Sequence, residues 1–202
     1  MPTAVTLAAM AYLLILFWNL AALLPIGLGW WGVFPVLGLY WFENACTGWF
    51  QYRRMSDLER ARPDPRQPFP MSRFFAMHYG IFTSVHGILV LAFFGLASGG
   101  FREAANGWWL SAAVVVFLQW QGYREWQRAD GAMRSSSGRL MAEPYARVLV
   151  LHVIVLVGGF LALSAAEPRN ILMLFAALKL AVELAANALW SRFAGDAAAQ
   201  RR

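Results

Sequence analysis

The most constraining feature of the sequence is the long apolar stretch from Phe69 to Ala97, which contains two of the three histidines of the chain. A helix needs about 20 predominantly apolar residues to cross a bilayer, and this stretch is longer than that. Ionisable side chains such as His78 and His86 are costly inside a membrane and usually mark functional positions there. The stretch therefore predicts a membrane-spanning helix that carries part of a functional site.

Similar apolar stretches recur along the whole chain. The composition agrees, since 59% of the residues are hydrophobic and 14% are charged, against about 45–50% and about 25% in soluble domains. We therefore expect an all-α, polytopic membrane protein in which residues 1–202 form one bundle of six transmembrane helices. The helices are expected at about residues 5–24, 31–51, 71–97, 108–123, 144–165 and 171–193. The polar segments that follow the second and fourth helices are expected to be loops.

The basic residues predict the orientation of this bundle. Every arginine except Arg102 and Arg169 falls near the two polar segments or near the C-terminal end. Cytoplasmic loops carry an excess of Lys and Arg, so both termini are expected in the cytoplasm of a multi-pass bacterial inner-membrane protein. The net charge of +6 then indicates attraction to anionic lipid head groups, and no nucleic-acid partner is expected.

Ionisable and polar residues recur inside four of the predicted spans. The 1.5 Å rise per helical residue places one group in an inner layer, namely Glu43, His78, His152 and Glu183, with His86 and Lys179 further out. The candidate metal ligands are Glu43, His78, His86 and His152. The other candidate buried polar residues are Asn44, Tyr79, Lys179 and Glu183.

A metal site is the sharpest interpretation of this layer. Imidazoles with a carboxylate suit a divalent metal, zinc first and copper or iron as alternatives. His78 and His86 are separated by about 12 Å along a straight helix and by about 80° around it, so they share one ion only if the helix bends near Gly80. The alternative is that each histidine forms a hydrogen bond to a neighbouring helix. Lys179 and Glu183, four residues apart, are expected to neutralise each other.

Small residues predict where the helices approach closely. Gly80, Ser84 and Gly87 share one face of the third predicted helix. A second cluster occurs in the fifth predicted helix, at Gly158, Gly159 and Ala162. Small faces of this kind let membrane helices pack backbone to backbone.

Three stretches, LYWFENACTGWF, FFAMHYGIFTSVHG and PYARVLVLH, resemble the motifs of an uncharacterised bacterial six-helix membrane family. The resemblance implies that the motif residues are Glu43, Asn44, His78, Tyr79, Gly80, His86 and His152, and it implies no activity. The six-helix arrangement is also similar to that of rhomboid-like proteins, although the serine motif GxSG of that family is absent.

These patterns lead to three functional hypotheses. The first is a membrane protein whose His/Glu cluster binds a divalent metal and, if it is an enzyme, hydrolyses a lipid or membrane-protein substrate with Glu43 as ligand or base. The second is a non-catalytic, rhomboid-like scaffold or binding protein. The third is a proton or ion pathway through Glu43, His86, Lys179 and Glu183. The sequence settles neither catalysis nor oligomeric state.

Overall fold

Helices form the regular secondary structure of the part of the chain that the computed structural model describes, residues 23–65, 69–97, 99–105, 107–164 and 168–199. This confirms the all-α prediction. The elements are α2 (Val33–Ala61), α3 (Met71–Leu89), η1 (Val90–Ala97), η2 (Gly100–Ala105), α4 (Trp108–Arg128), α5 (Gly131–Arg134), α6 (Ser137–Ala142), α7 (Tyr145–Val153), η3 (Ile154–Gly158), α8 (Gly159–Ser164) and α9 (Pro168–Ala199). The first predicted helix, residues 5–24, lies almost entirely outside the described residues.

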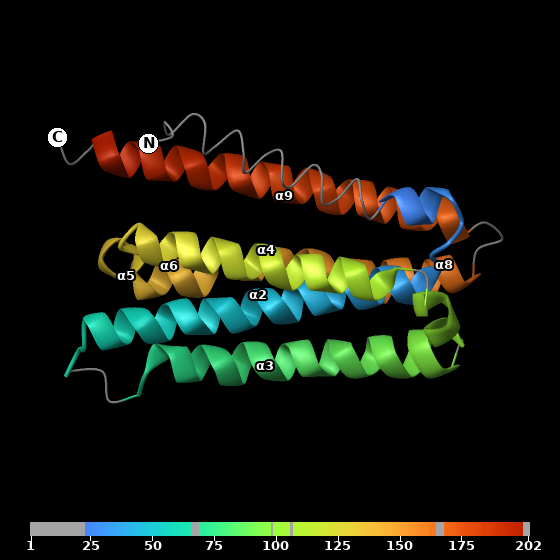
Figure 1. Cartoon of the computed structure of the whole chain (residues 1–202), viewed down its shortest axis with the longest axis horizontal. Coiled ribbons are helices and arrows are strands. Elements are labelled where there is room, and N and C mark those ends of the chain that lie inside the picture. The colour runs from blue at the N-terminus through green and yellow to red at the C-terminus, as the bar shows by residue number, and fades with distance from the viewer. Residues whose placement is uncertain (1–22, 66–68, 98, 106, 165–167, 200–202) are drawn as a thin grey trace.

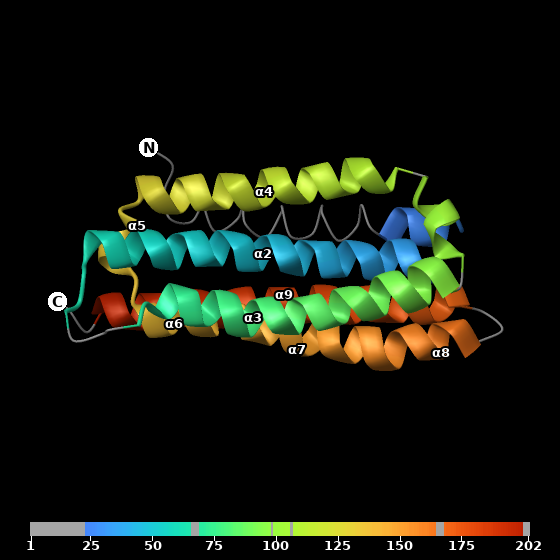
Figure 2. The same cartoon turned by 90° about the horizontal axis from the view of Figure 1, so that it is seen from below.

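Helix α2 is the central element of the bundle. It lies between α3 and α4 in both views (Figures 1 and 2) and also contacts α5 to α9. Every residue from Val33 to Tyr40 is buried, so the first two turns of α2 have no exposed face. A helix that is apolar all round is expected to be surrounded by other elements. The stretch 69–97 packs against this centre and is not itself the centre.

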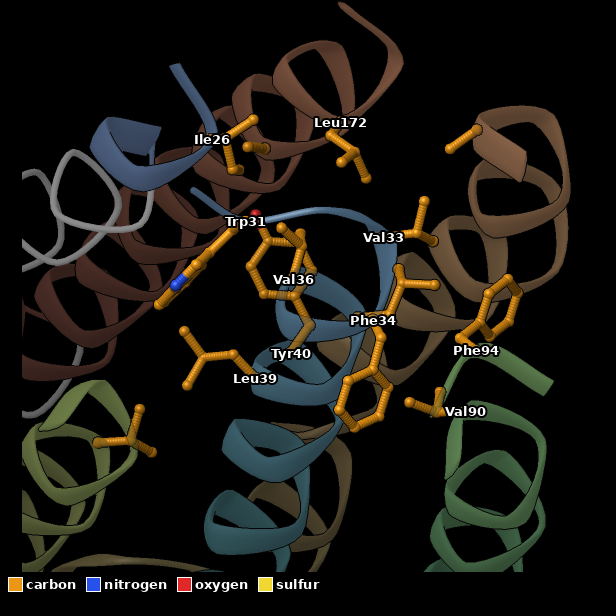
Figure 3. Packing of buried hydrophobic residues seen from close by; sticks show 14 residues of the cluster. Ile26, Trp31, Val33, Phe34, Val36, Leu39, Tyr40, Val90, Phe94 and Leu172 are labelled. Carbon is orange, nitrogen blue, oxygen red and sulfur yellow. The ribbon is translucent and has the colours of Figure 1, made fainter. Parts of the chain in front are cut away.

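The main apolar core lies where α2 begins. Side chains from α2, η1 and α9 converge there, as Figure 3 shows for Phe34, Phe94 and Leu172. Phe94 and Val90 of η1 are completely buried. Truncating a fully buried Phe to Ala costs about 3–5 kcal/mol, so this end of the bundle is firmly held.

Helix α2 continues ten residues beyond the predicted end of the second span, which corrects the expected loop. It ends at Ala61, just before Pro63, because proline cannot continue a helix. The extension buries Met55 and Leu58 in a second apolar cluster. Its Glu59 carboxylate accepts hydrogen bonds from the backbone N–H (2.8 Å) and the hydroxyl (2.5 Å) of Ser72. An anion at a helix N-terminus is favourable, so α2 caps the start of α3.

The polar segment after α4 is also folded, where a loop was expected. It contains the short helices α5 and α6, which pack against the end of α2. Asp130 takes a left-handed conformation (φ 52°) at the turn into α5. Leu140 is buried in the second apolar cluster, and its carbonyl accepts a hydrogen bond from the Gln51 amide. The sequence of this segment is polar, but its apolar residues cover the end of the bundle.

Two helices change winding at the same end of the molecule. Helix α3 continues into the π-helical η1, and α7 continues through the π-helical η3 into α8. A Cβ on Gly159 would approach the Phe94 ring to 2.5 Å, so the glycine allows the ring to lie directly on the backbone of α8. The predicted small-residue cluster of the fifth span is therefore buried against η1 and α9, with Ala162 fully enclosed.

Among the described residues, one helical stretch is long and apolar enough to cross a membrane, namely Met71–Ala97. The prediction of six spanning helices is therefore not supported by helix length and apolarity. In α2 and α4 the apolar runs are interrupted by polar residues such as Glu43, Asn44 and Gln119 and by tryptophans and tyrosines. Aromatic side chains with a polar group are amphipathic and contribute little to hydropathy.

Candidate functional site between helices α3 and α7

Polar side chains of α2 bond to a different neighbouring helix at each level. Asn44 bonds to α3, where the Tyr79 hydroxyl donates to the Asn44 side-chain oxygen at 2.8 Å. Thr47 bonds to α4, because the Gln119 amide donates to its hydroxyl at 2.8 Å. Interhelical hydrogen bonds of this kind hold polar side chains in otherwise apolar bundles. The predicted buried residues Asn44 and Tyr79 therefore join α2 to α3.

Glu43 forms an ion pair with Lys179 of α9, with 3.0 Å between the carboxylate oxygen and Nζ. Both residues are buried, and Nζ also lies 5.1 Å from the centre of the Tyr40 ring. Lys179 therefore pairs with Glu43 of α2, whereas the sequence predicted that it would pair with Glu183 of its own helix. The side chain of Glu183 lies outside the described residues.

His86 and His152 form a direct contact between α3 and α7. The distance from Nε2 of His86 to Nδ1 of His152 is 2.7 Å, and His86 is 4% exposed. Nδ1 of His86 lies 2.9 Å from the carbonyl oxygen of Phe82. Tyr79, Thr83 and His86, the stripe of α3 at i, i+4 and i+7, are all buried.

These distances determine the hydrogen positions in the uncharged pair. A carbonyl oxygen only accepts, so Nδ1 of His86 carries a hydrogen and donates it to Phe82. Nε2 of His86 is then unprotonated and accepts from Nδ1–H of His152. Nε2 of His152 is left as an unprotonated acceptor, and the described part of the chain supplies no hydrogen-bond donor to it.

His78 does not join this pair. It is exposed and stacks on Phe74, with 5.8 Å between the ring centres. Its ring also lies 6.0 Å from that of Tyr145, at the start of α7. Helices α3 and α7 run in the same direction (Figure 2), with Tyr145 level with His78 and His152 level with His86. The estimate from sequence, which placed His152 level with His78, is wrong because α7 begins deeper in the bundle than α3.

A cavity of about 210 Å³ lies between α3 and α7. Its walls are mostly apolar and aromatic, and His78 and the exposed Leu149 lie where it opens. The hydroxyl of Tyr145, which is buried, has no hydrogen-bond partner among the described residues. The lining residues are His78, Tyr79, Phe82, Tyr145, Val148, Leu149 and His152. We refer to this space as the α3–α7 cavity.

Sequence reasoning missed Tyr145 and Phe82. A signal for Tyr145 was present, because it precedes His152 by seven residues and therefore shares its helix face. Nothing in the sequence pointed to Phe82. Its role depends on its backbone carbonyl, which bonds to His86, and on its ring, whose centre lies 4.2 Å from that of the His86 ring.

A second hollow of about 580 Å³ runs between α2 and α3 and includes Trp41, Tyr79 and Thr83 in its walls. Its main polar groups are already paired: the Trp41 indole N–H donates to the Thr83 carbonyl at 2.8 Å, and Tyr79 bonds to Asn44. This groove therefore offers fewer unused hydrogen-bonding groups than the α3–α7 cavity.

The metal prediction is wrong for the residues that the structure describes. No group of three or more His, Cys, Asp or Glu side chains among them is placed to hold a metal ion. Glu43 is paired with Lys179, His78 is exposed, and only His86 and His152 meet. The hypotheses of a zinc, copper or iron site and of a metal-dependent hydrolase are therefore withdrawn.

Comparison with known proteins gives one match. The model of a family of unknown function, DUF6498, matches residues 1–201. No curated protein and no solved structure matches the chain. The match agrees with the predicted membership of an uncharacterised family, and it bears neither on membrane insertion nor on rhomboid similarity. Since the match extends over almost the whole chain, this protein belongs to the family of unknown function DUF6498.

Proposed function

We propose that this protein is a multi-pass protein of the bacterial inner membrane that binds a small molecule in the α3–α7 cavity. Support for the membrane comes from the outer surface of the bundle. Large apolar side chains are exposed on α3, α4, α7 and α9, among them Ile88 (68%), Trp109 (73%) and Leu174 (66%). Soluble monomers rarely expose apolar surface on this scale, whereas a bilayer covers it without cost.

The distribution of charge supports the proposed orientation. Helices α5 and α6, the end of α2 and the start of α3 lie together at one end of the bundle (Figures 1 and 2). These segments contain the exposed arginines Arg60, Arg73, Arg134 and Arg139, whereas η2 at the opposite end contains Arg102. The arginine-rich end is the cytoplasmic one under the positive-inside rule.

The observation that carries the binding proposal is an unused hydrogen-bond acceptor in the lining of a mostly apolar and aromatic cavity. In the uncharged His86–His152 pair, Nε2 of His152 is an acceptor without a donor among the described residues. The other lining residues are mostly apolar or aromatic. A few polar groups in an otherwise apolar pocket are typical of small-molecule sites. A bound molecule with a donor hydrogen pairs with this acceptor and buries its apolar part against the walls.

Leu149→Trp tests this proposal, because the larger ring fills the opening of the cavity. Purified wild-type and variant proteins are extracted with organic solvent, and the extracts are compared by mass spectrometry. We expect one or more small molecules to be present with the wild type and largely lost from the variant.

Val153→Trp is the matched control, since Val153 is also an exposed apolar residue of α7 but does not line the cavity. Its extract should match that of the wild type. Identical extracts from all three proteins would overturn the binding proposal, provided that thermal unfolding shows each variant to be folded.

A further inference from the structure

The size of the α3–α7 cavity limits the part of a ligand that it encloses to about one substituted ring. An apolar cavity of about 150 Å³ in a protein core accommodates benzene. The α3–α7 cavity measures about 210 Å³, which leaves room for a six-membered ring with one or two small substituents. A fused ring system or a long polar chain is too large for it.

The shape and composition of the walls favour an aromatic ring. Three phenyl-type rings line the cavity, from Tyr79, Phe82 and Tyr145. Tyr79 and Tyr145 meet edge to face, with 6.4 Å between ring centres at an angle of 83°. Offset and edge-to-face arrangements are those that aromatic pairs prefer, so a further ring gains stacking energy as well as apolar burial.

The unused acceptor Nε2 of His152 defines the substituent. In the uncharged pair this nitrogen needs a hydrogen-bond donor. A hydroxyl group supplies that hydrogen without carrying a charge. A carbonyl or an ether offers no hydrogen to Nε2, and a carboxylate would place a charge against an apolar wall.

We infer that the α3–α7 cavity binds a hydroxylated aromatic ring, of the kind found in a phenol or in the head group of a membrane hydroquinone. The inference rests on the proposed function and names the chemical class of its ligand. The ligand hydroxyl donates to Nε2 of His152, while the ring lies among Tyr79 and Phe82.

Two fluorinated probes of similar size test this chemistry, 4-fluorophenol and 4-fluoroanisole. Binding to the protein in nanodiscs is followed by the fluorine NMR signal of each probe. Only the phenol carries a donor hydrogen, so we expect it to bind about five-fold more tightly, the factor that corresponds to one net hydrogen bond. This comparison uses the wild-type protein and does not depend on any variant.

His152→Phe removes the acceptor nitrogen and keeps an aromatic ring in its place. It should weaken 4-fluorophenol binding by a similar factor of about five, whereas 4-fluoroanisole binding changes less. Tyr52→Phe is the matched control, because Tyr52 lines the groove between α2 and α3 and not the α3–α7 cavity.

The outcomes separate the inference from the proposed function. Equal affinity for the two probes overturns the inference that the ligand is a hydroxylated ring. So does the absence of binding of either probe while Leu149→Trp still changes the extract. In both cases the binding proposal stands. No probe binding together with unchanged extracts overturns both. A hydroxyl preference abolished by His152→Phe upholds the inference.

A further arm identifies the source of the ring. A hydroquinone with an alkyl tail is incorporated into the nanodisc bilayer and tested for displacement of 4-fluorophenol. Displacement assigns the site to a membrane hydroquinone. Its failure, with phenol still bound, assigns the site to a phenol that enters from water.

Discussion

Glu43 and Lys179 show how a buried charge is tolerated in this bundle. Their side chains are 11% and 10% exposed and their charged atoms are 3.0 Å apart. Removing one member of such a pair leaves the other charge unpaired in apolar surroundings. Removing both members relieves that penalty, so the two substitutions should not be additive.

We expect Glu43→Gln and Lys179→Met each to lower the free energy of unfolding by about 3–5 kcal/mol, because each leaves a single buried charge. Thermal unfolding in detergent measures the loss. The double variant Glu43→Leu with Lys179→Met should be more stable than either single variant. A double variant whose loss equals the sum of the two single losses would show that the ion pair contributes nothing.

At the residue scale, the spacing of residues along one helix shows which of them share a face. It does not show which residues of two different helices lie at the same level. Tyr79, Thr83 and His86 are spaced at i, i+4 and i+7, and all three lie on the buried face of α3. This spacing could not pair His86 with His152, because that contact depends on where α7 begins relative to α3. The starting level of α7 is set by α5 and α6, whose polar sequence gave no sign that they fold against α2.

At the scale of elements, the contact between α2 and α3 depends on glycines that lie under aromatic rings. A Cβ on Gly87 would lie 2.6 Å from the ring of Trp41. Gly80, seven residues earlier on the predicted small-residue face, has no atom within 4 Å of such a Cβ. The face therefore does not act as a unit, since Gly87 accommodates a ring of α2 and Gly80 faces open space.

Gly87→Ala should lower the free energy of unfolding by about 1–3 kcal/mol, because the added methyl group forces Trp41 and the helix pair apart. Gly80→Ala is the matched control and should be neutral or stabilising by up to about 1 kcal/mol, since it restricts only the unfolded chain. Chemical or thermal unfolding of both variants provides the test. Equal effects would mean that the Gly87 contact does not limit the approach of the helices.

The sequence located α3 and η1 well, because an uninterrupted apolar run has clear ends at Pro70 and Gly99. It placed the end of α2 too early, because the charged residues after position 51 were taken as a loop. In a helix that extends beyond the apolar layer, the same charges lie on one face while Met55 and Leu58 stay buried on the other. Charge alone therefore does not end a helix.

At the scale of the whole molecule, the two ends of the bundle differ in charge, and this difference predicts the side of the membrane on which each end lies. Arg134 of α5 and Arg102 of η2 are both exposed and lie at opposite ends. If the arginine-rich end faces the cytoplasm, Arg102 and Arg169 lie on the periplasmic side.

Single-cysteine variants test this orientation after Cys46, the only cysteine of the chain, is replaced by serine. A membrane-impermeant maleimide added to intact spheroplasts should label Arg102→Cys and leave Arg134→Cys unlabelled. Both should react once the membrane is permeabilised. Labelling of Arg134→Cys in intact cells would reverse the orientation, and equal labelling of both would refute insertion across the membrane.

The ion pair between α2 and α9 has a consequence for the synthesis of the protein. The chain is made from its N-terminus, so Glu43 is translated well before Lys179. During that interval the carboxyl group has no counter-ion from α9, and in the proposed membrane location it is costly to keep in lipid. A chain that stops before α9 retains this uncompensated acidic group in its central helix. The electrostatics of α2 are therefore complete only once α9 has been synthesised and has packed against it.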